Sequence, residues 1–121
     1  PMDGMCLMLG SNDLLCGASP AAAAARMEDL LDRLGAYGAS LLLIAPPRFC
    51  PGTWVTEEGL IDASARLAAL YRTLAQDRAV AFADAGEWDI PLAFDGVHFT
   101  EDGHVKFAEQ AQAAFAQAFG T

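Results

Sequence analysis

The stretch SLLLIA, residues Ser40 to Ala45, predicts the fold more clearly than any other part of the sequence. It is short and apolar at consecutive positions, a pattern typical of a strand that is covered on both faces in a parallel sheet between helix layers. MCLML (Met5–Leu9) and AVAFAD (Ala79–Asp84) show the same pattern. We therefore expect three buried, parallel strands.

A helical segment follows each expected strand. The first has Ser19 as its N-cap and Pro20 at the first helical position, and it ends near Gly35 or Gly38. The second spans about residues 57–76, and the third starts at a Thr100 cap and runs to Phe119. The apolar spacing of the third predicts an inward stripe of Val105, Phe107, Ala108, Ala111, Phe115 and Phe119. Three strand–helix units in succession predict an α/β fold with a parallel sheet and right-handed crossovers.

Length and composition limit the classes of function. The 121 residues fit one domain, and 7 basic against 16 acidic residues give a net charge of −9. This balance argues against a nucleic-acid or anionic-membrane partner, which would need clustered Lys and Arg. The three cysteines, Cys6, Cys16 and Cys50, lack a CxxC spacing, so we expect buried, reduced thiols rather than a disulfide framework. The sequence leaves the cellular compartment open, with the cytoplasm slightly favoured.

Polar residues follow the expected strands, at the edge where parallel α/β sheets bind their ligands. GSND (Gly10–Asp13) follows the first strand, and DGVHFTEDGH (Asp95–His104) precedes the last helix. Gly10 permits a sharp turn, and the side-chain amide of Asn12 can act as an oxyanion donor. Asp95 and His98 lie three residues apart, so the carboxylate can orient the imidazole as a general base. Both segments also have an ordinary structural interpretation, as turn and helix-cap sequences.

Other polar and aromatic residues near this edge carry weaker signals. Val97, Phe49 and Trp54 are candidates for a substrate pocket, although loop aromatics that only cover the core are an equal alternative. We interpret His104 as a surface residue in the first turn of the last helix. No spacing supports a metal site, since zinc needs three or four suitable ligands. We expect no cofactor, and the lack of a Gly-rich phosphate loop argues against a nucleotide or phosphate binder.

The two polar segments resemble known signature blocks. Gly10-x-Asn12-Asp13 after an apolar strand and Asp95-x-x-His98 before the last helix are similar to two of the four blocks of the SGNH hydrolase family, the GDSL-type esterases and lipases. LLLIAPP (Leu41–Pro47) resembles the arylesterase and acyltransferase branch. The resemblance covers nearly the whole chain. It implies a three-layer, flavodoxin-like fold and metal-free hydrolysis of small esters by a serine, with His98 as base, Asp95 as its orienting acid and Asn12 in the oxyanion hole.

The sequence departs from this family because it contains no Gly-Asp-Ser block and no second block. Ser11 is the one serine expected at the active edge, but no G-x-S-x-G elbow surrounds it. We therefore expect residues 1–121 to form a partial domain with the last three strand–helix units, completed by an N-terminal segment or separate chain that carries the nucleophilic serine. The strand Met5–Leu9 would then be an exposed edge. A non-catalytic binding or scaffold domain remains the alternative, and self-association remains open.

Overall fold

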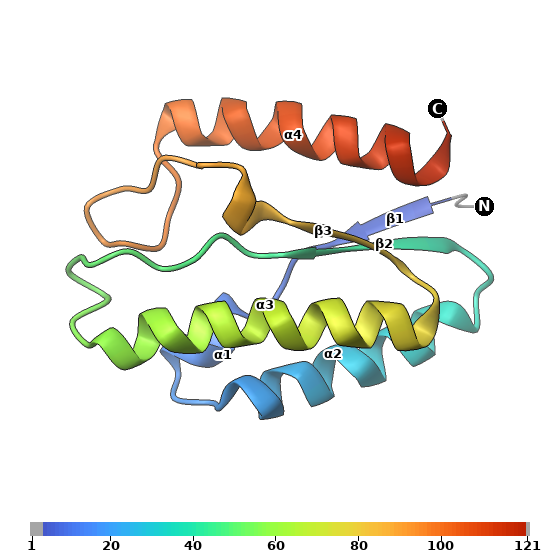
Figure 1. Ribbon diagram of the computed structural model, residues 1–121, viewed down its shortest axis with the longest axis horizontal. Helices are drawn as coiled ribbons and strands as arrows, with labels where there is room; N and C mark the ends of the chain where they lie inside the picture. Colours follow the sequence, from blue (N-terminus) through green and yellow to red (C-terminus); the bar gives the residue numbers. More distant parts are fainter. Residues whose placement is uncertain (1–3, 121) are drawn as a thin grey trace.

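The computed structural model describes residues 4–120, and its centre is a three-stranded parallel sheet (Figure 1). The strands β1 (Gly4–Leu7), β2 (Ser40–Ala45) and β3 (Ala81–Asp84) pair in the order β1-β2-β3. The helices α1 (Ser11–Leu15), α2 (Pro20–Gly35) and α3 (Glu58–Arg78) lie on one side of the sheet, and α4 (Glu101–Phe119) lies on the other (Figure 1). This arrangement confirms the predicted α/β fold and its three strand–helix units.

The central strand β2 supplies both halves of the core, because successive side chains of a strand point to opposite faces. Leu41, Leu43 and Ala45 pack against the α2 and α3 side, while Leu42 and Ile44 pack on the α4 side. All five are at most 7 % exposed. The interpretation of SLLLIA as a strand covered on both faces is therefore confirmed.

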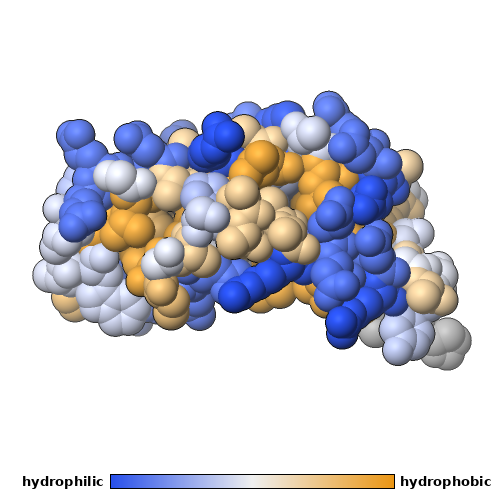
Figure 2. All heavy atoms as spheres, turned by 90° about the horizontal axis from the view of Figure 1, so that it is seen from below, coloured by the Kyte–Doolittle hydropathy of each residue, from blue (hydrophilic) through white to orange (hydrophobic). Residues whose placement is uncertain are grey.

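Helices α2 and α3 are the helices expected from the sequence. The Ser19 side chain accepts a hydrogen bond from the Ala22 N–H at 3.1 Å, and Pro20 starts α2. Helix α3 continues two residues beyond the expected end and stops at Ala79, which has a left-handed φ of 55°. Their inner faces are buried against β2, whereas Figure 2 shows hydrophilic and apolar residues side by side on the outer face of this helix layer. Within residues 4–120, none of the helices is sufficiently long and apolar to span a bilayer.

Helix α4 begins after the expected Thr100 cap, which accepts a hydrogen bond from the Gly103 N–H at 2.9 Å, but its inward stripe differs from the prediction. Val105 is 59 % exposed and Ala108 is exposed as well. The predicted Phe107, Phe115 and Phe119 do pack inward, and they are joined there by Ala114 and Ala118. Val105 lies two residues from Phe107 along the helix, so the two side chains point in nearly opposite directions.

The end of β1, the segment after it and the burial of the cysteines differ from expectation. The strand ends at Leu7 rather than Leu9, and the GSND segment, expected as a turn or cap sequence, opens the short helix α1. The three cysteines are free, but they are exposed rather than buried. Cys6 is exposed because β1 is at the edge of the sheet, where Met5 and Leu7 pack on the opposite, α2 and α3, side. Within residues 4–120, the outer edge of β1 has no partner strand, as predicted.

Candidate active site

The carboxyl ends of the strands meet loops that are far apart in the sequence, at the left of Figure 1. A cavity of about 480 Å³ opens there. One wall comes from residues 8–13, between β1 and the end of α1, and the other from Pro46, Pro47, residues 97–99 and His104. Asn12 and His98 therefore face the same cavity.

Asp95 and His98 form a closely bonded pair at this wall. One carboxylate oxygen, Oδ1, accepts hydrogen bonds from the backbone N–H groups of Val97 at 2.8 Å and His98 at 2.9 Å. The other oxygen, Oδ2, lies 2.6 Å from Nδ1 of the His98 ring. Asp95 is buried, with 7 % of its surface exposed, whereas the His98 side chain is 60 % exposed. A buried carboxylate thus holds an accessible imidazole.

The electrostatics of the pair favour an ionised acid. The N–H of Val97 lowers the pKa of Asp95 below its ordinary value, and the N–H and ring of His98 act in the same direction, although burial opposes them. An ionised Asp95 can only accept at Oδ2, so Nδ1 of His98 must carry the proton of that hydrogen bond. The neutral ring then has its lone pair at Nε2, which is the arrangement required of a general base.

Asn12 reaches the cavity from the first turn of α1 and is exposed. The position of this turn depends on Gly10, whose φ is 125°. A Cβ atom at Gly10 would come within 2.6 Å of Tyr71 Oη and 2.8 Å of Leu67 Cδ2. The Tyr71 hydroxyl also donates to the Leu9 carbonyl at 2.9 Å, and burial raises its pKa to about 12. Tyr71 therefore supports the turn that presents Asn12, a contact that the sequence pattern did not reveal.

The three expected pocket residues have different positions. Val97 lines the cavity and is half-buried. Phe49 does not line it: the side chain is 3 % exposed and packs in the core on the α2 and α3 side, so its assignment to the pocket was wrong. Trp54 does not line the cavity either, and instead contacts the His98 ring with the centroids 4.9 Å apart and the planes at 78°.

His104, Ser11 and Ser64 differ in their exposure and in their contacts. His104 is exposed, as predicted, and it also lines the cavity, with its ring 5.2 Å from that of Phe99. Ser11 lines the cavity at the start of α1. Ser64 is buried and is hydrogen-bonded to the N–H of Phe49 and to the carbonyl of Ile61. Among the described residues, no three His, Cys, Asp or Glu side chains are placed to hold one metal ion.

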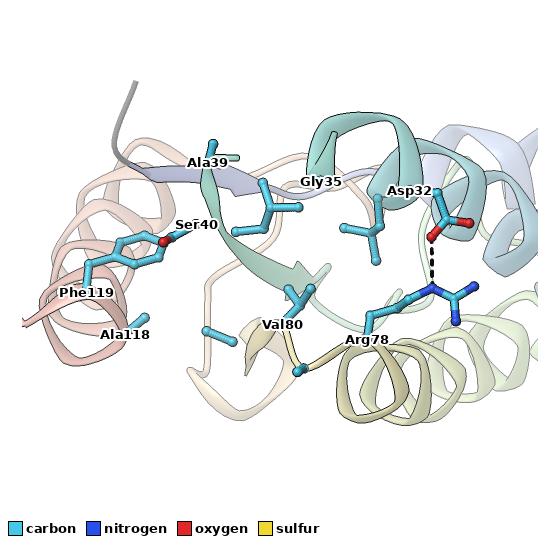
Figure 3. Close-up of a pocket in the computed structure, with 12 residues that line it drawn as sticks. Asp32, Gly35, Ala39, Ser40, Arg78, Val80, Ala118 and Phe119 are labelled. Atoms are coloured by element: carbon cyan, nitrogen blue, oxygen red, sulfur yellow. Dashed lines mark hydrogen bonds and ion pairs between the residues drawn. The ribbon is translucent and has the colours of Figure 1, made fainter. Parts of the chain in front are cut away.

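A second cavity, of about 500 Å³, lies at the opposite ends of the strands (Figure 3). Ser40 and Ala81, the first residues of β2 and β3, line it together with Phe119. Its charged lining groups are Asp32 and Arg78, which are paired at 2.9 Å. Arg78 also donates to Glu28 at 2.7 Å. Since these charges already satisfy one another, we assign no chemistry to this cavity.

Comparison with known proteins gives the family that the two polar segments of the sequence resemble. A family model described as "GDSL-like Lipase/Acylhydrolase family" matches residues 1–106. The chain therefore belongs to the GDSL-like lipase/acylhydrolase family, whose members are carboxylic ester hydrolases. No curated protein sequence matches it.

Solved structures share the fold. A carbohydrate acetylesterase family member from Sinorhizobium meliloti has a TM-score of 0.88 at 24 % identity, with 100 % of this chain and 63 % of that chain covered. The aryl esterase of M. smegmatis has a TM-score of 0.74 at 31 % identity, with 94 % and 62 % covered. The carbohydrate acetylesterase Est24 from Sinorhizobium meliloti has a TM-score of 0.80 at 25 % identity, with 97 % and 61 % covered. The chain thus spans somewhat more than three fifths of the length of these proteins.

Proposed function

We propose that this chain supplies the acid, the base and one oxyanion donor of a serine esterase that acts on small carboxylic esters. The observation that carries the proposal is the 2.6 Å contact between Asp95 Oδ2 and His98 Nδ1 at the wall of a cavity shared with Asn12. A histidine that is oriented by a buried carboxylate and exposed on its other side is suited to general-base catalysis. The aryl esterase and the carbohydrate acetylesterase among the structural neighbours support the same class of reaction.

The nucleophilic serine is proposed to lie on a segment N-terminal to these residues. The outer edge of β1 offers unpaired backbone groups, and within residues 4–120 no strand occupies it. A further parallel strand at this edge would end beside α1, at the same side of the sheet as the cavity. The greater length of the structural neighbours leaves room for such a segment.

In the proposed mechanism, Nε2 of His98 takes the proton of the serine hydroxyl while the serine oxygen attacks the ester carbonyl carbon. The negative charge that forms on the carbonyl oxygen is stabilised by the Asn12 amide, and loss of one such donor lowers kcat by about 100- to 1,000-fold. The alcohol leaves with the proton from His98. Water, deprotonated by His98, then hydrolyses the acyl-enzyme, or a second alcohol accepts the acyl group.

The cavity suits a small acyl group. Its volume of about 480 Å³ lies toward the lower end of ligand pockets, which span about 300–1,000 Å³. Met8, Leu9, Pro46, Pro47 and Val97 give it apolar walls beside the polar groups. Short-chain esters are therefore the proposed substrates.

The proposal is tested by p-nitrophenyl acetate hydrolysis, measured for the 121-residue chain alone and for the gene product that includes the residues encoded before it. We expect activity from the longer protein and none from the chain alone. In the longer protein, His98→Ala should lower kcat by at least about 100-fold, because the nucleophile loses its base.

Two further variants identify the serine and check the fold. A fluorophosphonate probe should still label the longer protein when it carries Ser11→Ala, since the reactive serine is proposed to lie upstream. The surface change Asp62→Asn on α3 serves as the control for handling and folding. Full turnover by the chain alone, or by His98→Ala, would contradict the proposal. A longer protein that no fluorophosphonate labels would favour the non-catalytic binding or scaffold alternative.

A further inference from the structure

The loop between β2 and α3 is attached to the turn that carries Asp95. The N–H of Cys50 donates to the Gly96 carbonyl at 3.0 Å, that of Thr53 to the Phe94 carbonyl at 3.2 Å, and that of Trp54 to the Asp95 carbonyl at 3.1 Å. These three backbone bonds join residues about 40 positions apart. The turn at Asp95 is therefore held by a second element as well as by its own hydrogen bonds.

Two glycines make this close approach possible. A Cβ atom at Gly52 would lie 2.4 Å from the Asp95 carbonyl carbon, and one at Gly96 would lie 2.1 Å from the Cys50 carbonyl oxygen. Gly96 also has a left-handed φ of 83°. The loop itself is anchored at its end, because Val55 is 3 % exposed and exchanges two backbone bonds with Gly52. The contact between the loop and the turn is thus built into both backbones.

Trp54 extends this contact to the imidazole. Its ring meets the His98 ring edge to face at 4.9 Å, a geometry that is favourable for aromatic pairs. Within residues 4–120, the His98 ring has one hydrogen bond, to Asp95, and 60 % of its side chain is exposed. A ring held at a single point can tilt about that hydrogen bond. Trp54 restricts the tilt from one side.

We propose that Trp54 is a positioning residue, which holds the His98 ring in the orientation set by Asp95. Its side chain touches the ring, while its backbone N–H touches the turn of the acid, so it acts on both members of the pair. The catalytic consequence rests on the proposed function, but the orientation of the ring does not. Loss of the aromatic contact should lower the ratio of oriented to tilted ring by about 2- to 13-fold, which corresponds to about 0.5–1.5 kcal/mol for such pairs.

The experiment is NMR spectroscopy of the uniformly ¹⁵N-labelled 121-residue chain. In the unaltered chain we expect a His98 Nδ1–H resonance that is protected from exchange with water, and cross-peaks between the Trp54 and His98 rings. Trp54→Ala should make this proton exchange about 2- to 13-fold faster, whereas Trp54→Phe, which retains an aromatic edge, should restore most of the protection. Trp88→Phe is the matched control, because Trp88 packs against Phe107 under α4.

The readout separates positioning from folding and from the proposed esterase. Unchanged backbone amide spectra show that each variant is folded, and Trp54→Phe provides the comparison if Trp54→Ala does not fold. An Nδ1–H exchange rate that is the same in the unaltered chain, Trp54→Ala and Trp54→Phe would overturn the proposal. Absence of esterase activity in the longer protein would refute the proposed function but would leave this result unaffected.

Discussion

Gly10 shows most directly how a single residue positions the candidate site. Its positive φ of 125° turns the chain from β1 into α1, and its missing Cβ leaves room for Tyr71 and Leu67. Asn12 follows within the first turn of α1. The amide proposed to stabilise the oxyanion is therefore placed by a close contact between the backbone and α3.

Gly10→Ala should lower the free energy of unfolding by about 2–5 kcal/mol, since it combines a left-handed conformation with steric overlap. Gly17→Ala is the matched control: its φ is 96°, but nothing lies within 4 Å of the added Cβ. The control should show the conformational part alone, about 1–2 kcal/mol. Urea denaturation of both variants measures the difference. Equal losses of stability would show that the contact with Tyr71 and Leu67 exerts no steric effect.

Contacts within a short segment could be predicted from the sequence, but contacts between distant loops could not. The spacing of Asp95 and His98 suggested their hydrogen bond, because residues three apart in a turn can face each other. The contact between Trp54 and His98 joins two loops, and no local pattern reports it. Phe49 was misassigned for the same reason: an aromatic residue in a loop carries no periodicity that tells core from pocket.

At the scale of elements, an ion pair joins the loop after β2 to the end of β3. Arg48 donates to both carboxylate oxygens of Asp84, at 2.7 and 2.5 Å, and the Asp84 side chain is 5 % exposed. Burial alone would raise the pKa of Asp84, but the hydrogen bonds from Arg48 and from the Gly86 N–H outweigh it and lower the pKa. The pair thus stabilises the folded chain most at pH values at which Asp84 is ionised.

The sign of this shift predicts a pH dependence. Because the pKa of Asp84 is lower in the folded than in the unfolded chain, its contribution is complete above about pH 4 and is lost as the pH falls through the folded value. Arg48→Met should cost about 1–3 kcal/mol at pH 7, and the cost should shrink toward pH 3. Arg33→Met, which removes an exposed pair with Asp29, should cost less than about 1 kcal/mol. Urea unfolding at both pH values would contradict the account if the Arg48→Met cost grew in acid.

The three strands and the three long helices were predictable from the sequence, whereas helix α1 and part of the buried face of α4 were not. Strand β2 and helix α2 have strong signals in their apolar run and in the Ser19–Pro20 start. Helix α1 has five residues, too few to show a period, so GSND predicts a turn or a helix cap but not the helix itself. The inward stripe of α4 was predicted correctly for its three phenylalanines but not for Val105 and Ala108, because apolar residues occur on several of its faces and contact with the sheet selects among them.

At the scale of the whole molecule, the sheet separates two ends with different chemistry. At the carboxyl ends of the strands, His98 and Asn12 line one cavity and Asp95 is bonded to the His98 ring, while the paired Asp32 and Arg78 line the cavity at the amino ends. The sequence predicted the first grouping through the rule that parallel strands gather their functional groups at the carboxyl edge. In the part of the chain that the structure describes, no strand pairs with the outer edge of β1, which agrees with the proposal of a further strand that carries the serine.

The central claim is that Asp95 and His98 act as one unit, and a double-mutant cycle on the longer, active protein tests it most directly. The measurement is kcat/KM for p-nitrophenyl acetate in four proteins: unaltered, Asp95→Asn, His98→Ala, and the double variant. Asp95→Asn should lower kcat/KM by about 100- to 10,000-fold when His98 is present, and should have almost no further effect when His98 is absent. Independent losses that multiply in the double variant would contradict the claim.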